Sequence, residues 1–351
     1  MSTNNTPLNS KHKRFLFSFL IGVLIIGVVS CISLNISPWA ATMIIRSGFK
    51  KNAAKVNEAL VKHVPAGLTS LLNEHYDVND ADAYLDVYYP SSISNTETKL
   101  KTIVWTHGGA WISGNKGQLS NYCKILADKG FVVISIDYSI APKKKYPTPV
   151  RQLNAALKYL LANAERLHID TSAFFLAGDS GGSHIAAQEA NVISIESYAQ
   201  LLDIQPSISR SNLAGVILYC GPYDAQNISL EGEFGKFLKT ILWDYSGTKN
   251  FMTDPKFASA SVINYVTGSF PATFISVGNK DPLSSQSHNF VSKLQREGVE
   301  VDTLFFPVDY TPGLPHEYQF NLDNEAGNIA LDHSVKFLNR TGNKKLSLIH
   351  I

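Results

Sequence analysis

Cysteine is scarce in this chain, and its scarcity limits the redox and metal chemistry that the chain can support. Only three of the 351 residues are cysteine, namely Cys31, Cys123 and Cys220. Cys31 lies in an apolar N-terminal run, so the rest of the chain holds at most one pair, and the spacing of that pair demands no disulfide. No group of cysteines and histidines has the spacing of a metal site. The sequence therefore predicts no metal.

The chain also lacks an excess of charge and the glycine-rich loops that hold phosphate groups. Its 31 lysines and arginines nearly balance its 29 aspartates and glutamates, for a net charge of +2. Neither G-x-x-x-x-G-K-[ST] nor G-x-G-x-x-G occurs. We therefore expect no nucleic-acid partner. Since hydrophobic residues make up 44% of this length, the chain can bury the core of one large α/β domain with additional segments.

One long apolar run is present, and it lies near the N-terminus. Residues 1–14 form a polar, basic tail, and residues 15–34 carry no charge and are long enough as a helix to span ~30 Å. We expect 15–34 to be a membrane-targeting segment. It is open whether this segment is a retained signal anchor, a cleaved signal peptide, or a lipoprotein signal with Cys31 lipidated. Basic residues flank both sides, and we favour the outer, periplasmic or extracellular, face for the rest of the chain.

From residue 76, short apolar or alternating runs take turns with helical patterns. Strands are predicted at 84–89, 102–106, 131–136, 173–178, 213–219, 272–277 and 300–306. Helices are predicted at 118–129, 148–167, 284–297 and 324–340, with an irregular stretch at 222–270. This alternation predicts a mostly parallel central sheet with helices on both faces.

A serine between glycines follows one of these predicted strands. Residues 178–182 read G-D-S-G-G, and a helical pattern begins directly after them. Strand, sharp turn and helix are typical of a nucleophile elbow, in which a strained Ser180 lifts its Oγ out of the sheet. Side chains at Gly178 and Gly182 would collide there, because two backbone segments approach closely. As a nucleophile, Ser180 needs a base, a residue that orients the base, and donors for an oxyanion.

A second glycine-rich motif supplies candidate donors. Residues 107–111 read H-G-G-A-W and follow the predicted strand 102–106. Glycines let the backbone turn its N–H groups toward a cavity, so we expect Gly108 and Gly109, together with Gly181, to form an oxyanion hole. His107 is then expected to hold the loop rather than to act as the base.

These two motifs resemble those of the hormone-sensitive-lipase-like esterases of the α/β-hydrolase superfamily. The D-Y-S-I-A-P sequence at 137–142 is similar to the family's D-Y-R-L-A-P segment, with Ser139 in place of arginine, and the resemblance covers roughly 80–340. It implies an α/β-hydrolase fold. It also implies hydrolysis of carboxylic esters with short-to-medium acyl chains, through an acyl-enzyme and without a cofactor.

The same resemblance implies the partners of Ser180. The fold orders its triad as nucleophile, acid and histidine. G-N-K-D-P-L at 278–283 matches the family's G-x-x-D-x-L, which implies Asp281 as the acid. His316 lies in the place of the family's H-G-F, with Glu317 instead of the glycine, which implies His316 as the base. Asp224, after the strand 213–219, remains open as an alternative acid.

The predicted organisation therefore has five parts. They are the basic tail 1–14, the membrane or signal segment 15–34, a linker with cap helices at 35–75, the catalytic domain 76–345, and an end at 346–351. A partly amphipathic helix is expected over 38–65. The last six residues match what a transposon sequencing adapter would encode, so we interpret them as non-native.

The natural substrate is less constrained than the chemistry. Five aromatic residues are candidates to line an acyl or alcohol pocket, namely Trp111, Tyr223, Phe234, Phe237 and Trp243. An amidase or arylformamidase remains open, because the same motifs serve cleavage of C–N bonds. A non-catalytic binding protein of this fold is a further alternative, which the presence of both Ser180 and His316 disfavours.

Overall fold

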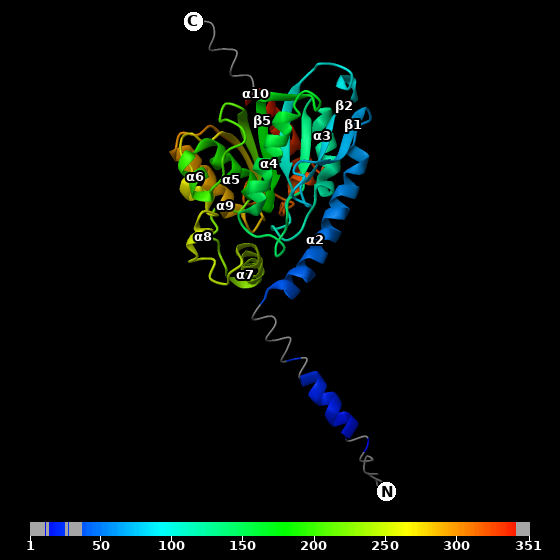
Figure 1. Ribbon diagram of the computed structural model, residues 1–351, viewed down its shortest axis with the longest axis vertical. Coiled ribbons are helices and arrows are strands. Elements are labelled where there is room, and N and C mark those ends of the chain that lie inside the picture. Colours follow the sequence, from blue (N-terminus) through cyan, green and yellow to red (C-terminus); the bar gives the residue numbers. More distant parts are fainter. Residues whose placement is uncertain (1–10, 12–13, 25–26, 28–36, 342–351) are drawn as a thin grey trace.

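An eight-stranded sheet forms the centre of the computed structural model, which describes residues 11, 14–24, 27 and 37–341 (Figure 1). Its strands lie in the order β1-β2-β4-β3-β5-β6-β7-β8. β2 pairs antiparallel with β1 and β4, and all other neighbours are parallel. The predicted, mostly parallel sheet is confirmed. The strands are β1 (Leu68–His75), β2 (Tyr84–Pro90), β3 (Leu100–Thr106), β4 (Val132–Ile136), β5 (Ile169–Asp179), β6 (Leu213–Tyr219), β7 (Ala272–Val277) and β8 (Val301–Phe305).

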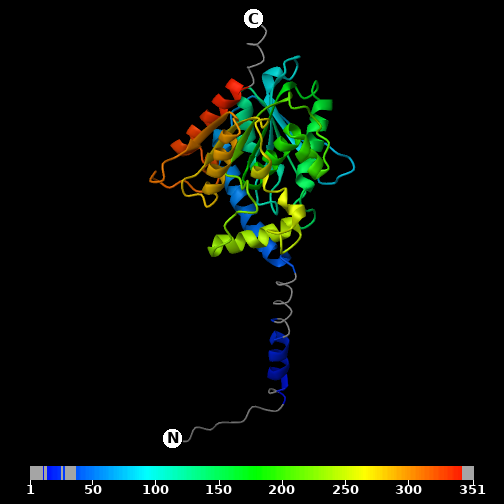
Figure 2. The same cartoon turned by 90° about the vertical axis from the view of Figure 1, so that its left-hand side faces the viewer.

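Helices cover both faces of this sheet (Figures 1 and 2). Successive side chains of a strand point to opposite faces. On β5, Phe174 and Leu176 therefore join the core on one face of the sheet, whereas Phe175 and Ala177 join the core on the other face. The helices are α2 (Trp39–Ala59), α3 (Ser120–Asp128), α4 (Thr148–Ala162), α5 (Ser180–Ser194), α6 (Glu196–Leu202), α7 (Gly232–Ser246), α8 (Pro255–Ala258), α9 (Ser284–Arg296) and α10 (Glu325–Thr341).

The sheet begins earlier in the chain than predicted. Residues 68–75, which we assigned to the linker and cap, form the edge strand β1, so the boundary at residue 76 is wrong. The pairing of β1 with β2 shifts between Leu71 and Glu74, and Asn73 adopts a φ of +60°. A bulge of this kind interrupts the alternation that identifies a strand in a sequence. The edge position also leaves much of β1 exposed.

The stretch 222–270 is less irregular than predicted, because it contains α7. The buried side chains of this helix include Leu238, Ile241, Leu242 and Tyr245, at helical spacing. Gly232 and Gly235, near the start of α7, obscured the helical pattern in the sequence. Gly235 is required by close packing, since a Cβ there would lie 2.0 Å from the carbonyl carbon of Leu230.

The helix expected over 38–65 is present as α2, and it packs across the end of the domain. The guanidinium of Arg46 donates to the carbonyl oxygens of Ile112 and Ala141, each at 2.6 Å. Phe49 meets Phe237 of α7 edge to face, with ring centroids 5.9 Å apart. α2 and α7 therefore form a cap that is fixed to the loops of the catalytic domain (Figure 2).

The N-terminal segment is described only in part. Within the described residues, we find no helix of the length and hydropathy needed to cross a membrane. Much of the predicted segment 15–34 lies outside the described residues, as do Cys31 and the end at 346–351. Residues 14–24 are helical, and their apolar side chains are exposed. The exposed fraction is 73% for Phe15 and 66% for Leu24.

Candidate active site

Ser180 is the first residue of α5 and directly follows the last residue of β5. Its φ is +50°, in the left-handed region that residues with a side chain seldom adopt. A Cβ on Gly178 would lie 2.5 Å from the carbonyl carbon of Gly182, and a Cβ on Gly182 would lie 2.0 Å from the carbonyl oxygen of Thr106. The strand, turn and helix are arranged as predicted, with Ser180 at the carboxyl end of a central parallel strand.

The loop after β3 lies against this elbow. Three consecutive residues have positive φ, namely Gly109 (+104°), Ala110 (+52°) and Trp111 (+59°). A Cβ on Gly181 would lie 3.4 Å from the backbone nitrogen of Ala110, so the loop contacts the first turn of α5. In the described part of the chain, the N–H groups of Gly109 and Ala110 donate to no protein acceptor. These two groups are therefore available to an oxyanion beside Ser180.

Gly108 has a different role from the one predicted. Its N–H donates to Oδ2 of Asp179 at 2.8 Å, and Nε1 of Trp105 donates to Oδ1 of the same carboxylate, also at 2.8 Å. The contact argues against Gly108 as an oxyanion donor, because its N–H is already used. The sequence analysis did not include Ala110 among the oxyanion donors, although Ala110 is the fourth residue of the H-G-G-A-W motif.

His107 holds the same loop, as predicted. Its Nδ1 donates to the carbonyl oxygen of Gly108 at 2.7 Å, and its ring stacks on Tyr138 with centroids 4.2 Å apart. Burial lowers the pKa of His107 to about 4, so the ring is neutral at physiological pH. A buried, neutral and already bonded imidazole of this kind is a structural residue.

The structure brings Asp281 and His316 together. Asp281 lies between β7 and α9, and His316 lies in the loop after β8. His316 Nδ1 is 2.8 Å from Asp281 Oδ2, and the side chain of Asp281 is fully buried. Because Nδ1 then donates to the carboxylate, Nε2 is left as the acceptor. Asp224 instead accepts from the N–H of Asn227 at 3.1 Å. In the described chain it has no hydrogen bond with His316, so it does not have the geometry of the acid.

The other histidines are placed away from this pair. His184 is buried on α5, and its Nε2 lies 2.7 Å from the carbonyl oxygen of Ala260. His288 stacks on Phe305, with centroids 4.2 Å apart, and His333 is exposed on α10. These are packing or surface histidines.

Cys220 was not singled out in the sequence, yet it lies beside the predicted acid and base. Its Sγ, an oxygen of Asp281 and a nitrogen of His316 lie within 4.8 Å of one another. These are possible metal ligands, but burial raises the pKa of the Cys220 thiol to about 11. A thiol must lose its proton to bind a metal, so at neutral pH Cys220 packs as a protonated thiol. The three residues therefore fit an acid–base pair better than a metal centre.

Burial and neighbouring groups shape the titration of this site. Burial disfavours the charged form of His316, but the contact with Cys220, the hydrogen bond to Asp281 and the Glu317 carboxylate raise its pKa well above the ordinary value. Burial and then the neighbouring Glu317 carboxylate raise the pKa of Asp179 well above its usual range. The imidazolium of His316 is thus favoured, as the proton transfer of acyl transfer requires.

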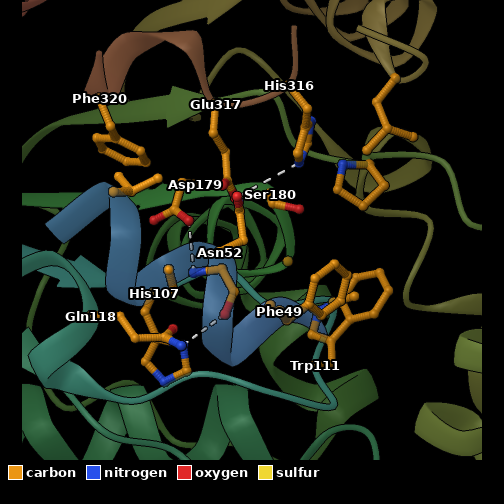
Figure 3. Close-up of a pocket in the computed structure, with 18 of the residues that line it drawn as sticks. Phe49, Asn52, His107, Trp111, Gln118, Asp179, Ser180, His316, Glu317 and Phe320 are labelled. Atoms are coloured by element: carbon orange, nitrogen blue, oxygen red, sulfur yellow. Dashed lines mark hydrogen bonds and ion pairs between the residues drawn. The ribbon is translucent and has the colours of Figure 1, made fainter. Parts of the chain in front are cut away.

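Ser180 and His316 both line one cavity of about 420 Å³ (Figure 3). The cap contributes to its wall, with Phe49 from α2 and Phe234 and Phe237 from α7. Trp111 also lines the cavity, whereas Tyr223 and Trp243 are not among its lining residues. Three of the five predicted aromatic residues therefore lie at the site.

The comparison with protein families identifies the chain. The family model BD-FAE matches residues 85–294. The chain belongs to the BD-FAE family. Among curated relatives, this BD-FAE protein is similar to an esterase of Gibberella moniliformis, with 27% identity over 249 residues, or 66% of this chain and 76% of the fungal esterase. It is also similar to an acetyl esterase of Salmonella paratyphi B, with 31% identity over 130 residues, or 34% of this chain and 40% of the relative.

A further relative is Esterase LipC of Mycobacterium tuberculosis, with 26% identity over 199 residues, or 55% of this chain. The match spans 48% of LipC, about half of its length. Among solved structures, Esterase B of Lactobacillus rhamnosis has a TM-score of 0.74 at 20% identity, covering 88% of this chain and 98% of Esterase B. A second structure of that esterase, inhibited by a tributyrin phosphonate, has a TM-score of 0.74 at 19% identity and covers 87% of this chain and 97% of the esterase.

The predicted α/β-hydrolase fold and carboxylesterase family are thereby confirmed. The BD-FAE protein is a carboxylesterase.

The raised pKa of His316 predicts the pH dependence of the carboxylesterase. The predicted base, His316, must be neutral to accept a proton, so we expect kcat/KM to rise with pH through its pKa. We expect the midpoint of this acid limb to lie above about 6.5, the ordinary value for histidine. The measurement is kcat/KM for p-nitrophenyl butyrate across acidic and alkaline pH, with spontaneous hydrolysis subtracted. A midpoint at or below that value would contradict the electrostatic description of the site.

Proposed function

We propose that the carboxylesterase cleaves esters through an acyl-enzyme on Ser180. The bond between His316 Nδ1 and Asp281 Oδ2, at the cavity that Ser180 also lines, is the observation that carries this proposal. His316 Nε2 takes the proton of Ser180 as the serine attacks, and then returns it to the leaving alcohol. Asp281 fixes the imidazole tautomer and stabilises the imidazolium. Water then attacks the acyl-enzyme with His316 again as the base.

The oxyanion of the tetrahedral intermediate is held by backbone N–H groups. We assign this role to Gly109, Ala110 and Gly181. The first two have no protein acceptor within the described chain, and Gly181 lies against Ala110. Donors of this kind act strongly because they are oriented before the charge develops. Asp179 supports them by fixing the preceding residue, Gly108.

The acyl chain is short to medium in length. The cavity is bordered by α2 and α7, and Phe49, Phe234 and Phe237 supply an apolar wall. The ring centroids of Phe234 and Phe237 lie 5.8 Å apart, so the wall is packed rather than open. A volume of about 420 Å³ holds a small ester better than a long acyl chain.

Substitution of the three residues tests the mechanism. Ser180→Ala removes the nucleophile, and we expect kcat for p-nitrophenyl butyrate to fall by a factor on the order of 10⁶, with a similar loss for His316→Ala. Asp281→Asn is expected to lower kcat by about 10⁴, because the wrong imidazole tautomer becomes favoured. Asp224→Asn is the matched control and should retain activity. Full activity of Ser180→Ala, or a larger loss in Asp224→Asn than in Asp281→Asn, would contradict these roles.

The same assay defines the substrate. For wild-type enzyme, Ser180-dependent hydrolysis should be fast for p-nitrophenyl acetate and butyrate, slower for octanoate and slowest for palmitate. N-formylkynurenine, which carries a formamide, tests the alternative of C–N hydrolysis. A preference for the formamide would contradict the ester assignment. Absence of Ser180-dependent turnover on every substrate would favour the non-catalytic alternative.

We also propose that the segment 15–34 attaches the enzyme to a membrane, with the catalytic domain on the outer face. The exposed apolar side chains of the described helical residues 14–24 support this proposal, since water disfavours such a surface. We expect Leu20→Arg to move the enzyme from the membrane fraction to the soluble fraction, because arginine inserts poorly into hydrocarbon. Val308→Arg is the control, since Val308 is 79% exposed on the catalytic domain. Retention of Leu20→Arg in the membrane fraction would contradict the anchor.

A further inference from the structure

The cavity has an apolar side and an acidic side, and Ser180 lies between them (Figure 3). Phe49 and Trp111 lie on the apolar side, whereas Asp179 and Glu317 lie on the other. No lysine or arginine is among the described residues that line the cavity. His316 faces Glu317 at 3.8 Å and balances it when protonated. When His316 is neutral, as a base must be, no lysine or arginine of the described lining balances the acidic side.

Glu317 presents its carboxylate to this cavity. It directly follows His316, and its φ of +60° turns the chain at that point. Its Oε1 lies 3.8 Å from His316 Nε2, and 27% of its side chain is exposed. Both oxygens of Asp179 already accept hydrogen bonds, from Trp105 and Gly108. The Glu317 side chain also forms a hydrogen bond with the Asp179 side chain, which two carboxyl groups can do only by sharing a proton. In the described chain, no protein N–H group donates a hydrogen bond to Glu317, so this acid pair keeps one negative charge at the cavity.

The position of Glu317 relative to His316 determines which part of an ester it meets. In the proposed mechanism, His316 Nε2 gives its proton to the leaving oxygen, which must come within about 3 Å of that nitrogen. Glu317 Oε1 is 3.8 Å from the same nitrogen. The first atoms of the alcohol therefore lie beside the Glu317 carboxylate, and the acyl chain occupies the apolar side.

We propose that Glu317 is a specificity-determining residue that selects esters whose alcohol carries a positive charge, such as a quaternary ammonium group, a few bonds from the ester oxygen. This inference rests on the proposed function, since it uses the leaving-group position that His316 defines. A cation there is attracted by the carboxylate in a partly enclosed site. The ring of Phe320 lines the same side of the cavity.

A pair of matched substrates tests this selection in the full-length enzyme. Butyrylcholine carries a trimethylammonium group, and 3,3-dimethylbutyl butyrate has the same shape with carbon in place of nitrogen. We expect wild-type kcat/KM to favour butyrylcholine by about tenfold or more, and added salt to reduce this ratio. Glu317→Gln keeps the shape and removes the charge, so the ratio should fall to about 1.

The control is Glu58→Gln, which removes an exposed carboxylate from α2. It should leave the ratio at the wild-type value, because Glu58 is not among the residues lining the cavity. A wild-type ratio near 1, or an unchanged ratio in Glu317→Gln, overturns the proposal. Hydrolysis of p-nitrophenyl butyrate separates this failure from failure of the proposed function. If that hydrolysis depends on Ser180 while the ratio is 1, only the role of Glu317 is wrong.

A binding measurement covers the case in which Glu317→Gln abolishes turnover. Calorimetry with phenyltrimethylammonium compares Ser180→Ala with Ser180→Ala/Glu317→Gln, and neither protein needs to react. We expect the dissociation constant to rise by about tenfold or more when Glu317 loses its charge. Equal affinity in the two proteins, or no binding to Ser180→Ala, overturns the proposal.

Discussion

The carboxylate of Asp179 joins the two loops on which the active site depends. Asp179 is the last residue of β5 and directly precedes Ser180. Its carboxylate accepts hydrogen bonds from Trp105 of β3 and from the N–H of Gly108. The elbow and the loop at 107–111 are thereby fixed to each other through one buried group. Because both bonds are buried, loss of either one would leave a polar group unpaired, which is costly. The positions of Ser180 and of the N–H groups at Gly109 and Ala110 follow from this connection.

Much of the site could be predicted, because parallel strands bring their carboxyl ends to one edge of the sheet. Ser180 follows β5, Asp281 follows β7 and His316 follows β8, so three residues far apart in the sequence meet at that edge. The short apolar runs of these strands are local signals, and the glycines of the elbow mark a close approach that no side chain tolerates. Local patterns and the topology of the fold therefore carried the prediction of the sheet, and the resemblance to the hormone-sensitive-lipase-like esterases supplied Asp281 and His316.

The features that were missed depend on contacts that no local pattern records. The bulge at Asn73 hid β1, and the close approach of Gly235 to Leu230 hid the start of α7. The role of Gly108 was misjudged, because the direction of its N–H depends on Asp179, which is 71 residues away. Glu317 was noticed as a substitution, but its approach to Asp179 depends on the left-handed turn after His316. Each case requires the three-dimensional arrangement of two distant segments.

A crystal structure of the enzyme inhibited by a short-chain alkyl phosphonate tests the central claim most directly. The phosphorus should be bonded to Ser180 Oγ, with one phosphoryl oxygen about 2.7–3.1 Å from the N–H groups of Ala110 and Gly181. The N–H of Gly108 should remain on Asp179, and His316 Nε2 should face the serine oxygen. A phosphonate bonded to another residue, or an oxygen held by Gly108 in place of Ala110, would contradict this account of the active site.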